Sequence, residues 1–305
     1  MTPQPEPPQA ESRQAESRQA ESRQAESRQA EPPRAASPQA ASRAVILDLT
    51  GRTALVTGAA GGIGRACALR LAAAGARIRA LDVDPEGLTA LAEEVARTAG
   101  PSAEAVEVHP LDLTRDAGLD AAERAADGAD VLVNAAGTQL VRPLEQFPPE
   151  AFRTMLTLML EAPFRTTRGA LPGMYARGFG RIVHISSVHG LRASAYKSAY
   201  VAAKHGLEGL SKTTALEAAE HGVTSNCVNP AYVRTPLVER QIADQAEAHG
   251  IPPERVVTDV LLADSALKRL LEVEEVAEAV AYLCTPAASF LTGSSLPLDG
   301  AWTAH

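Results

Sequence analysis

The stretch Thr53-Ala-Leu-Val-Thr57-Gly58-Ala-Ala-Gly-Gly62-Ile63-Gly64 decides the fold class of this 305-residue chain. Thr53–Thr57 is a short apolar and β-branched run, as in a buried strand, and a helical sequence follows from Gly62. Glycines at such a turn let the backbone approach a pyrophosphate, while the N–H groups at the helix N-terminus attract its charge. The turn therefore predicts a dinucleotide site, whose candidate contacts are Gly58, Gly62, Ile63 and Gly64.

Strand and helix patterns alternate beyond this turn, which predicts an α/β fold: a doubly wound parallel sheet of Rossmann type, about seven strands, with helices on both faces. Residues 236–270 interrupt the alternation and are interpreted as a helical substrate lid over the cleft. The predicted strands are Thr53–Thr57, Arg77–Asp82, Ala105–His109, Asp130–Asn134, Arg181–Ser186, Val223–Asn229 and Ser295–Leu298, and the predicted helices are Gly62–Ala74, Pro85–Thr98, Arg115–Ala126, Pro149–Ala176, Ser198–His221 and Val273–Cys284.

The N-terminal segment 1–43 has a different composition from the rest. It contains four copies of Gln-Ala-Glu-Ser-Arg at residues 9–28. A period of five with no apolar residue larger than Ala offers no face to bury, so a disordered tail is expected, followed by a single dinucleotide-binding domain at 44–305. A charged helical arm is the alternative, since these residues favour helix.

The composition argues against nucleic acids and membranes as binding partners. The tail carries six Glu and six Arg, so the net charge of −8 falls on the domain, which argues against nucleic acid. The sequence has no apolar run of about 20 residues, so no membrane span is expected, and a cytoplasmic location is the default. Scattered Cys67, Cys227 and Cys284 suit core positions better than a metal site or disulfides.

Two carboxylates are placed to select the nucleotide. Asp82 ends the second predicted strand, 18 residues beyond Gly64, where it would accept ribose hydroxyl groups and repel a 2′-phosphate. This context strengthens the glycine-rich turn, which alone could be an ordinary strand–helix loop, and it favours NAD over NADP. Asp112 follows the third strand in His-Pro-Leu-Asp112-Leu113, where it would reach the adenine edge; helix capping is the alternative for Asp112.

A serine, a tyrosine and a lysine form the candidate catalytic centre. Ser187 follows the fifth predicted strand, and Tyr200 and Lys204 lie at i and i+4 on one helical face. A neighbouring ammonium and a positive nicotinamide would lower the pKa of the phenol towards that of a useful base. Ser187 would polarise the substrate oxygen. Alone, a Tyr four residues before a Lys is usually a solvated pair. The presence of Ser187 and of the glycine-rich turn upstream makes that interpretation weaker.

These motifs, together with Asn134-Ala-Ala-Gly137 and Asn229-Pro230, resemble the short-chain dehydrogenase/reductase family over essentially all of the chain after residue 50. The resemblance implies Tyr200 as the acid/base, Lys204 as the residue that holds the nicotinamide ribose, Ser187 as the residue that orients the substrate, and Asn134 as a cofactor contact. It also implies a homotetramer that pairs the two long helices at Pro149–Ala176 and Ser198–His221.

Within that family, the chain resembles the bacterial D-3-hydroxybutyrate dehydrogenase subfamily. The resemblance implies that polar side chains hold the carboxylate of a small 3-hydroxy acid while its C3 hydroxyl faces Ser187 and Tyr200. Each of these polar residues has a plainer alternative as a loop or surface residue. The positions matching this substrate set are Gln139, His189, Lys197 and Gln241, with Tyr232 replacing a Trp of the cleft wall.

One departure affects the expected chemistry. Met159 aligns with a family Asn that relays protons through water, and a thioether cannot replace that amide. Pro163 has no N–H to bond the Met159 carbonyl, so our hypothesis is that this carbonyl remains free for the water. Two alternative functions stay open here: the same chemistry on another alcohol or on a 3-oxoacyl thioester, and an NAD-binding scaffold whose catalysis has lapsed.

Overall fold

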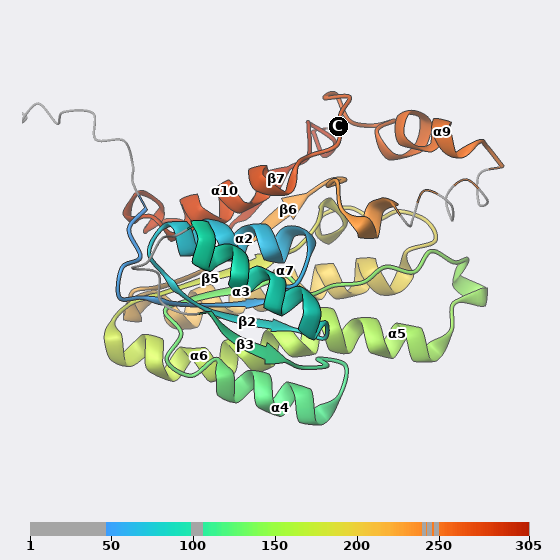
Figure 1. Cartoon of the computed structure of the whole chain (residues 1–305). Coiled ribbons are helices and arrows are strands. Elements are labelled where there is room, and N and C mark those ends of the chain that lie inside the picture. Colours follow the sequence, from blue (N-terminus) through green and yellow to red (C-terminus); the bar gives the residue numbers. More distant parts are fainter. Residues whose placement is uncertain (1–46, 99–105, 240–241, 243–245, 247–249, 305) are drawn as a thin grey trace, which may run out of the picture. The chain divides into compact units, whose positions relative to one another are not determined.

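Seven parallel strands form one sheet in the order β3-β2-β1-β4-β5-β6-β7 within the described residues (Figure 1). The computed structural model describes residues 47–98, 106–239, 242, 246 and 250–304, so the expectation for the tail at 1–43 lies outside the described residues. The strands are β1 (Thr53–Thr57), β2 (Arg77–Asp82), β3 (Glu107–Pro110), β4 (Val131–Asn134), β5 (Gly180–Ile185), β6 (Val223–Pro230) and β7 (Ser295–Leu298).

Helices pack on both faces of this sheet, which confirms the predicted doubly wound architecture. On one face, α2 and α10 cover the strands, and the other face is covered by α4 and α6. The helices are α2 (Gly62–Ala73), α3 (Pro85–Thr98), α4 (Asp116–Ala125), α5 (Pro149–Leu156), α6 (Ala162–Arg177), α7 (Ser198–Ala218), α9 (Pro253–Val256) and α10 (Val273–Cys284).

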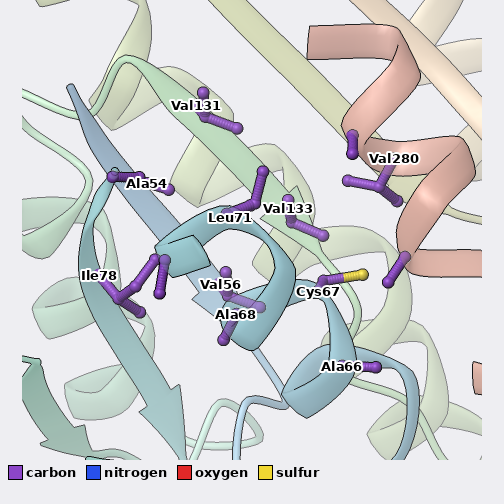
Figure 2. Packing of buried hydrophobic residues seen from close by; sticks show 14 of the residues in the cluster. Ala54, Val56, Ala66, Cys67, Ala68, Leu71, Ile78, Val131, Val133 and Val280 are labelled. Carbon is purple, nitrogen blue, oxygen red and sulfur yellow. The ribbon is translucent and has the colours of Figure 1, made fainter. Parts of the chain in front are cut away.

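The central strands β1 and β4 are largely apolar because both of their faces are buried. Val56 and Val133 point towards α2 and α10, as Figure 2 shows, whereas their neighbours Leu55 and Leu132 point into the cluster beneath α4 and α6. Alternate residues of a strand face opposite sides, so a parallel sheet covered by helices on both sides requires such continuous runs. The sequence pattern therefore predicted most strand ends to within two residues.

One predicted helix is present but distorted. The continuous helix expected over Pro149–Ala176 is divided by a π-helical turn, η2 (Thr157–Glu161), in which the Ala162 N–H donates to the Thr157 carbonyl five residues back. Pro163 cannot donate the α-helical bond to Met159, which is a local reason for the wider turn. Met159 itself is buried, and its Sδ lies 3.5 Å from where a Cβ on Gly137 would be.

Two further segments bear on the sequence-based expectations. The last three residues of the helix predicted to reach His221 form a separate 3₁₀ turn, η4 (Ala219–His221). In the lid region, α9 is followed by the π turn η5 (Val257–Leu261), and both contribute buried residues to a small apolar cluster against which Tyr232 packs. In the part of the chain that is described, no helix is both long and apolar enough to cross a membrane.

Close packing of α4 against α6 depends on Gly169. A Cβ at this position would lie 2.2 Å from the Glu123 carbonyl oxygen of α4. We expect Gly169→Ala to lower the free energy of unfolding by about 1–3 kcal/mol, because either the helices or the side chain must shift. Urea denaturation measures this loss. Gly209→Ala on α7 is the matched control, because its Cβ would meet nothing within 4 Å; equal midpoints for the two variants would contradict the close approach.

Candidate active site

A cleft of about 410 Å³ opens at the carboxyl ends of β1, β4, β5 and β6, where an open parallel sheet binds its ligands. It runs from the glycine-rich turn after β1 and from Asp82 on β2 to Lys197 just before α7 and Tyr232 after β6. A single cleft therefore joins the glycine-rich turn and Asp82 to the three predicted catalytic residues and to most of the predicted substrate residues.

The glycine-rich turn forms one end of the cleft. Gly58 and Gly62 have φ values of +68° and +52°, which disfavour residues with a Cβ. At Gly64, a Cβ would lie 2.1 Å from the Gly58 carbonyl oxygen, so only glycine lets α2 begin so close to the turn. Gly62, Ile63 and Gly64 also open α2 and line the cleft. The cradle left by the missing side chains and the N-terminus of α2 fit the pyrophosphate of a dinucleotide.

Asp82 lies where a nucleotide ribose would be held. Its Oδ2 accepts a hydrogen bond from the Ala60 N–H at 3.0 Å, and its Oδ1 accepts one from the Asp84 N–H at 3.1 Å. These bonds fix the carboxylate beside the glycine-rich turn. Asp84, which the sequence analysis did not single out, also lines the cleft, and its Oδ1 accepts hydrogen bonds from the N–H groups of Glu86 and Gly87, each at 3.1 Å.

Three predicted cofactor contacts do not line the cleft. Asp112 accepts bonds from the N–H and Oγ1 of Thr114, which lower its pKa, and this supports the structural alternative for Asp112. Leu113 is buried in the core. Asn134 is buried as well: its Oδ1 accepts from Thr166 at 2.8 Å and its Nδ2 lies 3.2 Å from Nδ1 of His184.

The structure brings the three candidate catalytic residues together at the cleft. Ser187 follows β5, and its Oγ accepts a hydrogen bond from the His189 N–H at 3.1 Å. Tyr200 and Lys204 lie one turn apart on α7, with the Lys204 Nζ 5.5 Å from the centre of the Tyr200 ring. The same ammonium donates to the Ile185 carbonyl oxygen at 2.7 Å. A phenol, a hydroxyl and an ammonium thus converge on one end of the cleft.

Burial controls the protonation of these groups. It raises the pKa of Tyr200 to about 12, opposed by a hydrogen bond with Ser187, and it lowers the pKa of Lys204 to about 8, opposed by the negative charge of Glu208. In the protein alone, removal of the phenolate from water therefore dominates the pKa of Tyr200, and acidification of the phenol by Lys204 stays a prediction. A bound cationic nicotinamide would supply the missing positive charge.

Four of the five residues predicted to bind the substrate also line the cleft: Gln139, His189, Lys197 and Tyr232. Lys197 is buried, with its Nζ 3.0 Å from Nε2 of His189 and donating to the Tyr232 hydroxyl at 3.0 Å. Burial and then Lys197 lower the pKa of His189 to about 3, so this imidazole is neutral and its Nε2 accepts from the ammonium. Gln139 lines the cleft, and both atoms of its amide are buried without a hydrogen-bond partner. Gln241 lies outside the described residues.

Sequence reasoning missed residues that support the site from outside the recognised motifs. Trp302, near the C-terminus, packs edge-on to the His189 ring with centroids 5.7 Å apart. Glu208 on α7 is buried and bonds Asn229 on β6. Spacing gives no signal for either, because the partners are distant in sequence and meet only in the fold.

Comparisons with known proteins place this geometry among dinucleotide-dependent enzymes. A family model described as enoyl-(acyl carrier protein) reductase matches residues 58–303. The D-beta-hydroxybutyrate dehydrogenase of Rhizobium meliloti (strain 1021) is 46% identical over 259 residues, which cover 83% of this chain and 99% of the relative. The enzyme of the same name from Cupriavidus necator is 41% identical over 261 residues, 84% of this chain and 100% of the relative.

Solved structures show the same fold. A protein described as an NAD(P)-dependent gluconate 5-dehydrogenase from Beutenbergia cavernae, with bound NADP at low occupancy, has a TM-score of 0.75 and 34% identity, covering 85% of this chain and 100% of that one. The L-sorbose reductase of Gluconobacter frateurii, complexed with NADPH and L-sorbose, has a TM-score of 0.76 and 29% identity, covering 84% and 97%.

Proposed function

The chain belongs to the short-chain dehydrogenase/reductase family, and we propose that within it the protein interconverts (R)-3-hydroxybutyrate and acetoacetate with NAD. Membership makes it an oxidoreductase. The finer assignment is supported by its similarity to two D-beta-hydroxybutyrate dehydrogenases and by the chemistry of the cleft. A short hydroxy acid needs a cation for its carboxylate and a proton acceptor for its hydroxyl, and the cleft offers both.

The observation that carries this proposal is the buried ammonium of Lys197 at the substrate end. Only 4% of this residue is exposed, and its third N–H remains after the contacts to His189 and Tyr232. A buried ammonium is costly unless an anion or several acceptors surround it. In the same cleft, the unpartnered amide of Gln139 can donate to a carboxylate oxygen. A small carboxylate satisfies both groups together.

The chain's own residues supply the proton chemistry. In the oxidative direction, the Tyr200 phenolate takes the proton of the C3 hydroxyl, while the Ser187 Oγ–H orients that oxygen. Lys204 holds the nicotinamide ribose and stabilises the phenolate. A nicotinamide cofactor held by Lys204 and the glycine-rich turn would supply the hydride acceptor for C3 and, in the reverse direction, the hydride donor. In that direction, Tyr200 gives its proton to the ketone oxygen.

A substrate assay tests the proposal against its alternatives. The protein is expected to form NADH from (R)-3-hydroxybutyrate and not from the (S) enantiomer, as followed by absorbance. Oxidation of 3-hydroxyacyl thioesters alone would favour the thioester alternative, because a thioester has no free carboxylate to meet Lys197. Failure to oxidise any alcohol with NAD or NADP, despite binding NADH, would favour a scaffold that has lost catalysis.

The cofactor preference gives a second prediction. Asp82→Ser removes the carboxylate that we expect to face the 2′ position. The ratio of kcat/KM with NAD to kcat/KM with NADP is expected to fall by about 10- to 100-fold, because like-charge repulsion of the 2′-phosphate is removed. Parallel kinetics with the two cofactors measure the ratio. Asp127→Ser, at an exposed position outside the cleft, is the control. A parent protein without preference, or an unchanged ratio in Asp82→Ser, would remove the basis for NAD.

We propose that the protein is a homotetramer and is located in the cytoplasm. In support of self-association, Phe164 on α6 and Leu216 on α7 are 45% and 86% exposed, so both long helices present large apolar side chains. Light scattering of the purified protein determines the number of subunits.

A further inference from the structure

A buried carboxylate lies one helical turn behind the catalytic lysine. Glu208 on α7 is only 4% exposed, and both of its oxygens accept hydrogen bonds, as an ionised carboxylate does. Its Oε1 accepts from Nδ2 of Asn229 at 2.5 Å, and its Oε2 accepts from the Ser295 hydroxyl at 2.7 Å. Glu208 thereby ties α7 to β6 and β7 from beneath the cleft.

The same bonds reach the segment that carries the catalytic serine. Nδ2 of Asn229 also donates to the Ser187 main-chain oxygen, at 3.0 Å. The space for the carboxylate depends on Gly190, where a Cβ would lie 2.9 Å from the Glu208 Oε1 and 2.5 Å from the Ser186 Oγ. Glu208, Asn229 and the Ser187 backbone therefore form one connected unit behind the reacting groups.

The charged groups around Lys204 show how this unit can affect the protonation of that lysine. The titratable groups that act on Lys204 or feel its charge come from three elements: Glu208 on α7, Cys227 on β6 and His184 on β5. Burial raises the pKa of the Cys227 thiol, which is therefore neutral, and burial followed by Lys204 lowers the pKa of His184 to about 3, so His184 is neutral too. Among these three groups, Glu208 alone brings a full charge of opposite sign to the ammonium.

We propose that Glu208 is a positioning residue with two roles: its carboxylate keeps Lys204 protonated in the working enzyme, and its bond to Asn229 holds the Ser187 segment in place. The proposal rests on the function assigned above to Lys204 and Ser187. It explains why a carboxylate occupies a buried position on a helix, where an ion without a compensating partner is strongly unfavourable.

The test of the electrostatic role uses Glu208→Gln, an isostere that keeps an oxygen for Asn229 and removes the charge. The dissociation constant of NADH, measured by fluorescence from pH 6 to pH 10, reports the state of Lys204 without any turnover. In the parent, binding is expected to weaken above about pH 8, where Lys204 loses its proton. In Glu208→Gln this weakening is expected about one pH unit lower. An unchanged pH dependence would overturn the electrostatic role.

Two further variants separate charge from structure. Ser295→Ala removes one hydrogen bond and leaves the carboxylate, so its pH dependence should match the parent. Glu208→Asp keeps the charge on a shorter side chain that withdraws from Asn229, so kcat for acetoacetate reduction should fall about tenfold with the NADH pH dependence retained. Unchanged kcat would overturn the positioning role, even if Glu208→Gln did not fold. A parent that lacks turnover would count against the proposed function, and the NADH titrations would still decide the electrostatic role.

Discussion

Tyr200→Phe is expected to lower kcat for oxidation of (R)-3-hydroxybutyrate by about 100- to 10,000-fold, the usual contribution of a general acid or base. The phenol lies in the cleft beside Ser187 and Lys204. Phenylalanine keeps the ring and its packing while it removes the atom that exchanges the proton. The dissociation constant of NADH should therefore change little, and the loss should appear in turnover.

The pH dependence of the parent gives an independent check on the same residue. Because burial raises the pKa of Tyr200 to about 12, the phenol is protonated at neutral pH and ready to give a proton to a ketone. Oxidation needs the phenolate instead, so its rate should rise with pH between 6 and 9, whereas reduction should not.

Stopped-flow absorbance of NADH measures both directions for the parent and for Tyr200→Phe. Tyr282→Phe is the control, because that phenol is exposed on α10, outside the cleft. If Tyr200→Phe oxidises the hydroxy acid as fast as the parent does, proton transfer by Tyr200 is wrong. Equal loss in both variants would point to a general effect on the fold.

Local sequence patterns predicted the sheet and the glycine-rich turn well, because their causes are local. An apolar run followed directly by a glycine-rich turn fixes β1, the turn and the start of α2 together, and the φ values of Gly58 and Gly62 meet the requirement that the sequence implied. The i,i+4 spacing of Tyr200 and Lys204 placed both on one face of α7 in the same way.

The errors arise where tertiary partners decide. Asn134 ends β4 beside the glycine-rich turn, yet its side chain points beneath the sheet to Thr166 and His184. Glu208 resembles an ordinary surface residue four positions after a lysine, and it is buried because β7, 87 residues later, covers it with Ser295. The spacing of residues along one strand or helix does not predict where either side chain points. The π turn has a local cause and a non-local one. Pro163 removes one α-helical hydrogen bond locally, but a π turn results only because the helix continues beyond it.

Lys197→Met is expected to raise the KM for (R)-3-hydroxybutyrate by about 10- to 100-fold, because a hydrogen bond to a charged group contributes about 1.5–3 kcal/mol. Methionine fills a similar volume without the charge. The methyl ester of the same acid has no carboxylate, so its KM should be similar in parent and variant. Lys212→Met, at an exposed position on α7, is the control for loss of a lysine.

The ionisation of Lys197 sharpens this prediction. Burial lowers its pKa to about 8, so the ammonium is present below that pH and is lost above it. In the parent, the KM for the acid should rise as pH increases through this range, whereas Lys197→Met should lack that rise and the ester should show none with either protein. A parent KM that is independent of pH, together with an unchanged KM in Lys197→Met, would show that the carboxylate binds elsewhere.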